Sequence, residues 1–80
     1  MPTLDLIGPY RIYFYSHEPN EPPHVHIDRD DATMKVWLGN LTVASSRGFR
    51  PKEIRKIVAM VESDAAAYLE RWNDYFQQGR

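Results

Sequence analysis

The sequence predicts an α+β domain in which a three- to four-stranded antiparallel β-meander is followed by one long C-terminal α-helix packed on the sheet. Two observations support this fold class. Residues 10–43 hold short runs rich in aromatic and β-branched residues, whereas residues 51–78 hold a continuous helical stripe. Eighty residues make a single domain, 1–80, and a chain this small buries a modest core, which is compatible with a homodimer.

Strands are expected at residues 10–15, 24–29 and 32–38, with a short fourth strand at 41–43. Two-residue turns at Asp30-Asp31 and Gly39-Asn40 would fix their register. One face then has only apolar pairs, which are Ile27–Met34, Val25–Val36, Leu38–Leu41 and Val36–Val43. The other face carries the histidines, in the pairs His26–Lys35 and His24–Trp37. From the first strand, Ile12 and Phe14 join the apolar face, and Arg11, Tyr13 and Tyr15 join the histidine face.

The second half of the chain is expected to form one helix over residues 51–78. Its apolar residues repeat at alternating spacings of four and three: Ile54, Val58, Val61, Ala65, Tyr68, Trp72 and Tyr75. About 28 residues span roughly 42 Å at 1.5 Å per residue, twice the ~20 Å of a typical strand. The helix must therefore overhang the sheet, bend, or break, and a break is easiest at Ser63-Asp64.

Composition narrows the classes of function. The net charge of −1 argues against a generally basic nucleic-acid binder, although a local basic patch remains open. The absence of cysteine excludes a disulfide framework and a thiolate site. We find neither a signal-peptide pattern nor an apolar run long enough to span a membrane, so a cytoplasmic location is expected.

The densest group of chemically active residues lies between positions 17 and 26. It holds all three histidines, two carboxylates and a rigid Pro-Pro pair: His17, Glu18, Glu21, Pro22, Pro23, His24 and His26. Imidazoles two apart on a strand project to the same side, and with carboxylates they suit a transition metal. The candidate metal ligands are therefore His24 and His26, together with His17, Glu18 and Glu21. The competing interpretation is a polar strand face on which His24 stacks against Trp37.

The same two histidines are also candidates for catalysis. His24 and His26 could act as a general acid and base, because imidazole titrates near neutrality. No nucleophile motif surrounds a serine or threonine, so the sequence offers no template for a reaction and leaves open whether the chain is an enzyme.

Two surfaces are candidates for binding. The histidine face adds Arg11, Tyr13, Tyr15, Lys35 and Trp37, a mixture of aromatic and basic side chains able to contact bases and phosphates or to pack on a protein. Arg50, Lys52 and Arg55 make the predicted helix start basic, which suits phosphate or nucleic acid, or else a solvated surface. The aromatic end of the helix is either core or a docking site for a partner.

The chain resembles a bacterial group called domain-of-unknown-function family 4160 over nearly its whole length. Four blocks carry the resemblance best: residues 11–16 (RIYFYS), 21–26 (EPPHVH), 35–38 (KVWL) and 72–76 (WNDYF). The family commonly has asparagine where this chain has His17, which leaves His24, His26, Glu18 and Glu21 as the better ligand candidates.

The resemblance implies partners rather than an activity. Members of the family are small and are often encoded beside another small protein, with which they are thought to form a toxin–antitoxin-like module. We therefore expect a component of a two-protein regulatory module that binds a nearby-encoded protein, and nucleic acid as a further ligand. The alternative is a small metal-binding protein or metal-dependent hydrolase or nuclease that uses His24 and His26.

Overall fold

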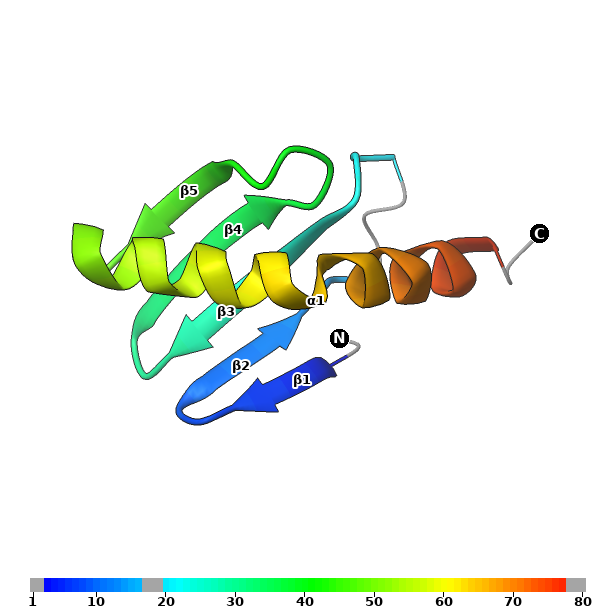
Figure 1. The fold of residues 1–80 in the computed structure, drawn as a ribbon. Coiled ribbons are helices and arrows are strands. Elements are labelled where there is room, and N and C mark those ends of the chain that lie inside the picture. The colour runs from blue at the N-terminus through cyan, green and yellow to red at the C-terminus, as the bar shows by residue number, and fades with distance from the viewer. Residues whose placement is uncertain (1–2, 17–19, 78–80) are drawn as a thin grey trace.

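The computed structural model describes residues 3–16 and 20–77 and has an α+β architecture with two layers, as predicted (Figure 1). One layer is an antiparallel sheet with strands in sequence order, β1-β2-β3-β4-β5. The other is a single helix, α1, which crosses one face of that sheet. The elements are β1 (Thr3–Ile7), β2 (Tyr10–Tyr13), β3 (His24–Arg29), β4 (Ala32–Trp37), β5 (Val43–Arg47) and α1 (Pro51–Gln77).

The register of β3 against β4 is the one that the alternating pattern predicts. Val25 lies opposite Val36 and Ile27 opposite Met34, and all four side chains are buried beneath α1. The two-residue turn at Asp30-Asp31 is confirmed, because Arg29 lies opposite Ala32. Asp30 adopts a φ of 54°, a left-handed conformation that aspartate tolerates better than most residues.

The predicted turn at Gly39-Asn40 is wrong. Leu41 has a φ of 57° and donates its N–H to the carbonyl of Trp37 at 2.8 Å, so the connection is longer than two residues. The side chain of Asn40 accepts hydrogen bonds from both the N–H and the hydroxyl of Thr42, which stabilises this wider loop. Leu38 and Leu41 therefore do not pair in the ladder, and the last strand is β5 at 43–47 instead of 41–43. Val36 does lie opposite Val43.

A first strand that the sequence did not reveal, β1, brings the sheet to five strands. Its apolar residues are only half covered: Leu4 is 8% exposed, whereas Leu6 is 71% exposed. A strand of five residues with one buried apolar side chain leaves little periodic signal. The second strand, β2, also ends earlier than predicted, at Tyr13.

The helix α1 is continuous over 27 residues, with no break at Ser63-Asp64. Its stripe covers the apolar sheet face, where Ile57 and Val61 are fully buried and Tyr68 and Trp72 are 3% and 5% exposed. Beyond the sheet, Trp72, Tyr75 and Phe76 surround the ring of Phe14, with ring centroids 5.1–5.5 Å apart. The overhanging end is therefore anchored by aromatic packing, and Tyr75, at 42% exposed, is the most open of these three aromatic side chains.

Candidate functional site

The sheet face opposite α1, called here the uncovered face, carries no secondary-structure element among the described residues (Figure 1). The strand registers align its side chains in two rows that cross the sheet from β2 to β5. The rows are Arg11–Asp28–Thr33–Arg47 and Tyr13–His26–Lys35–Ser45. The histidine face that the sequence predicts is therefore assembled on this side, with the exception of His24.

Ring contacts fix the aromatic part of the uncovered face. Tyr13 stacks on His26 with centroids 5.3 Å apart and planes at 18°, and Tyr15 meets His26 edge-on at 4.7 Å. The guanidinium carbon of Arg11 lies over the Tyr13 ring, 4.7 Å from its centroid. Within this arrangement Tyr13 is only 3% exposed. The face is thus a pre-packed platform, with little side-chain freedom left to lose on binding.

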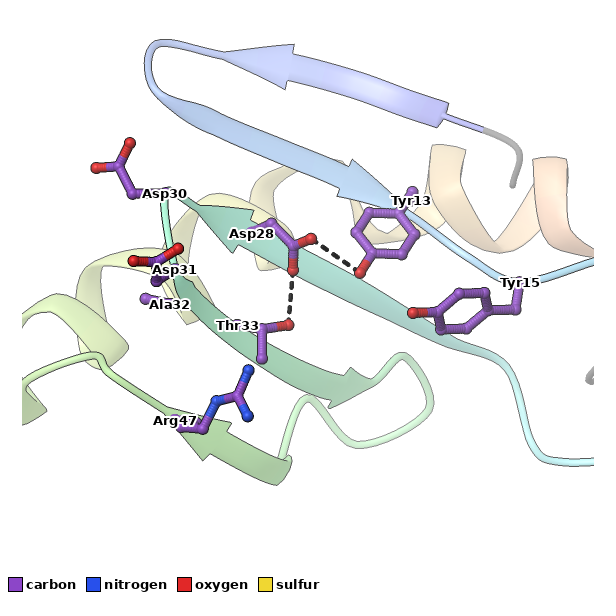
Figure 2. Close-up of a pocket in the computed structure, with 8 residues that line it drawn as sticks. All are labelled: Tyr13, Tyr15, Asp28, Asp30, Asp31, Ala32, Thr33 and Arg47. Atoms are coloured by element: carbon purple, nitrogen blue, oxygen red, sulfur yellow. Dashed lines mark hydrogen bonds between the residues drawn. The ribbon is translucent and has the colours of Figure 1, made fainter.

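An acidic hollow lies beside this platform. Figure 2 shows Asp28 at its centre, with Tyr13 and Thr33 pointing at the carboxylate from neighbouring strands. Tyr13 donates its hydroxyl proton to Asp28 at 3.0 Å and Thr33 donates its own at 2.6 Å. The hollow measures about 630 Å³ and is lined by Tyr13, Tyr15, Asp28, Asp30, Asp31, Ala32, Thr33 and Arg47.

The environment of Tyr13 keeps its phenol neutral. Burial, together with hydrogen bonds involving Tyr15 and Asp28, raises the pKa of Tyr13 well above its ordinary value. The phenol therefore acts as a hydrogen-bond donor at neutral pH and is a poor general base. Asp28 is not among the site residues predicted from the sequence, although it stands two residues after His26 and the period of the strand places it on the same face.

Two basic groups of the uncovered face, Lys35 and Arg11, already have partners. Lys35 forms an ion pair with Glu21 and lies 4.5 Å from the centroid of the Trp37 ring. Arg11 donates two hydrogen bonds to the Thr3 hydroxyl, at 3.0 and 3.2 Å. With Asp28 in the middle, this face offers mixed charge rather than a basic surface, which suits a protein better than a phosphate backbone.

His24 lies inside the protein, which corrects its assignment to the open face. Its ring is fully buried, 4.9 Å from the centroid of Trp72 on α1 and 5.5 Å from that of Trp37 on β4. A carbonyl oxygen only accepts, so the Nδ1 of His24, 2.9 Å from the Pro22 carbonyl, carries a proton. Pro23, the next residue in the same loop, accepts a hydrogen bond on its carbonyl from the N–H of Leu38. This ring thus packs the loop before β3 against the end of α1.

The four predicted metal ligands are brought together only in part. The rings of His24 and His26 lie 5.1 Å apart, and Glu21 is engaged with Lys35. Glu18, like His17, lies outside the described residues. Within the described ranges 3–16 and 20–77, no cluster of three or more metal-ligating side chains occurs.

The basic start of α1 is exposed, as expected, and is separate from the uncovered face. Glu53 accepts two hydrogen bonds from Arg29, at 2.7 and 2.8 Å, and one from Tyr10 at 2.7 Å. These bonds, from Arg29 first, lower the pKa of the Glu53 carboxyl. Arg50, Lys52 and Lys56 border a neighbouring hollow of about 410 Å³ with Tyr10 and Glu53, and Arg55 is exposed on the same stretch of α1.

Comparison with known proteins identifies a family and no activity. The family model described as a domain of unknown function (DUF4160) matches residues 10–73 of the 80. Neither a curated protein nor a solved structure gives a match. Among the described residues, no helix is both long and apolar enough to cross a membrane.

Proposed function

This chain belongs to the DUF4160 family, and from that premise and its geometry we propose that it is the binding component of a two-protein, toxin–antitoxin-like regulatory module. Its partner is a small protein encoded nearby, and the uncovered face is the contact surface. The observation that supports this most is the packing of the half-buried Tyr15 and His26 around the buried Tyr13, on a sheet face that no described element covers. Rigid aromatic side chains of this kind are typical of protein-binding hot spots.

Charge favours a protein over a nucleic acid at this face. Lys35 is paired with Glu21, and the Asp28 carboxylate lies in the adjoining row. A phosphate backbone would meet that carboxylate, and Lys35 could bind a phosphate only by giving up its ion pair with Glu21. A protein surface can match mixed charges with its own, so the arrangement costs it less.

The test is co-purification of the tagged chain with its genomic neighbour. We expect the wild type to retain the neighbour, and Tyr15→Ala with Lys35→Glu to lose it. The matched variant, Lys52→Glu with Arg55→Glu at the start of α1, should retain it. Loss only in the second variant, or binding of RNA or DNA in place of a protein, would assign the function to the basic surface instead.

A second candidate function is metal binding or metal-dependent hydrolysis at the histidine pair. The 5.1 Å between the rings of His24 and His26 favours it, since two imidazoles this close can share a metal after a small rearrangement. Elemental analysis of the purified protein is the direct check. A stoichiometric transition metal that His26→Ala removes would support this candidate, and a metal-free protein that does not bind added zinc or nickel would eliminate it.

A further inference from the structure

The strand β5 is the most open element of the sheet. It forms one edge, and all five of its residues are exposed. Val43 and Ser46 lie opposite Val36 and Met34, which are buried under α1, yet Val43 itself is 38% exposed. The helix therefore stops short of β5, and the strand is open on both faces as well as along its outer edge.

The opposite edge of the sheet differs from β5. The α1 residue Tyr68 donates to the carboxylate of Asp5 at 3.1 Å, and Arg71 donates to the Leu4 carbonyl at 2.9 Å. Among the described residues, no side chain of α1 makes such a bond to β5. Edge strands are commonly protected by charge or proline, but positions 43–46 of β5 carry neither. Its small side chains leave the backbone open to pairing.

Positive charge surrounds the C-terminal end of β5. Residues 47–56 contain five of the ten basic residues and a single acid, Glu53, which is bound to Arg29 and Tyr10. Asp30, at the neighbouring turn, also forms an ion pair with Arg29 at 3.4 Å. Residues 28–31 and 47–56 together hold six basic and four acidic side chains, so the positive charge stays in excess. An incoming segment that carries carboxylates would therefore be attracted to this edge.

The two faces of β5 set the pattern of such a segment. On the uncovered face, Arg47 reaches toward the acidic hollow (Figure 2) and Ser45 lies opposite Lys35. On the helix face, the exposed Val43 continues the apolar layer. A strand added here would place alternate side chains beside these two surfaces. An acidic residue placed beside Arg47, at the border of the hollow, and apolar residues placed beside Val43 would match the two faces.

A second copy of this chain is a poorer occupant. Pairing β5 with itself would bring together two chains that are both basic at this edge.

We propose that β5 is a β-augmentation edge that captures an extended partner segment of alternating acidic and apolar residues as a sixth strand. This rests on the proposed function and adds to it the part of the partner that is recognised. Main-chain hydrogen bonds to β5 supply affinity, and Arg47 with its basic neighbours supplies selectivity for acids.

The experiment uses labelled ten-residue peptides and the full chain, read out by fluorescence anisotropy. The probe alternates glutamate with valine. One control alternates lysine with valine, and another is the glutamate probe N-methylated at four consecutive central residues, which blocks both of its edges. We expect each control to bind at least tenfold more weakly than the probe. In the chain, Arg47→Glu should weaken probe binding at least tenfold, whereas Arg71→Glu, the same charge change near β1, should leave it within twofold.

The outcomes separate this inference from the proposed function. Equal binding of the methylated peptide, or equal loss in both arginine variants, would overturn the β5 assignment even if the neighbour co-purifies. Probe binding as expected without a co-purifying neighbour would uphold the edge and refute the two-protein module. A chain that is dimeric by light scattering, becomes monomeric with Arg47→Glu and ignores the probe would assign the edge to a second copy.

Discussion

Gly48 joins β5 to α1 and offers the sharpest test of how the sheet and helix are connected. Its φ is +88°, in the region that side chains disfavour. A Cβ added there would lie 3.0 Å from the Cβ of Ala32 and 3.1 Å from its Cα. Gly48→Ala would therefore combine backbone strain with a steric overlap against the start of β4.

The two costs can be estimated separately. A left-handed conformation costs an alanine about 1–2 kcal/mol, and overpacking of a tight site costs about 1–3 kcal/mol. We expect Gly48→Ala to lower the free energy of unfolding by about 2–5 kcal/mol. This is a large part of the total, because about 0.05–0.15 kcal/mol per residue gives roughly 4–12 kcal/mol for an 80-residue domain. Gly39→Ala is the matched control: nothing lies within 4 Å of its added Cβ. It should change stability by less than about 1 kcal/mol.

Urea unfolding followed by tryptophan fluorescence measures both variants. Ala32→Gly in the Gly48→Ala background should recover only part of the loss, because the contact with the Ala32 Cα and the backbone strain persist. A Gly48→Ala protein as stable as the Gly39→Ala control would refute the placement of this corner against β4.

Three further predictions concern titratable and buried groups. Glu53→Gln should destabilise the protein at neutral pH, because Arg29 lowers the pKa of the Glu53 carboxyl in the folded state. The difference in unfolding free energy from wild type should shrink as pH falls below the ordinary pKa of 4.5, and urea unfolding across pH 3–7 measures it. Burial, and after it their hydrogen bonds, raises the pKa values of Tyr13 and Tyr68. Ultraviolet titration should therefore show both phenols ionising at a higher pH than the ordinary pKa of 10.0, and the folded protein should lose stability as pH rises above that value. His24→Ala should cost about 2–4 kcal/mol in thermal or urea unfolding, since it empties a fully buried site and leaves a carbonyl without its donor; a cost below 1 kcal/mol would contradict its packing role.

The sequence by itself determined the α+β class, the register of β3 against β4 and the extent of α1. Each of these follows from a local period: Val25 and Ile27 alternate with His26, and Ile54, Val61 and Trp72 recur on one side of a helix. The covalent geometry of strands and helices fixes these periods, so they can be read without knowing what lies opposite. The uncovered face of Tyr13, His26 and Lys35 was predictable for the same reason.

Only the tertiary structure decided which groups meet across the fold. It placed β1 at an edge, buried His24 against Trp72, and paired Glu53 with Arg29 and Tyr10. It also left β5 without cover although its apolar Val43 lies opposite a core residue. The burial of a side chain depends on how far the helix extends over the sheet. That extent is decided by many contacts between residues distant in sequence, so no periodic pattern within one segment predicts it.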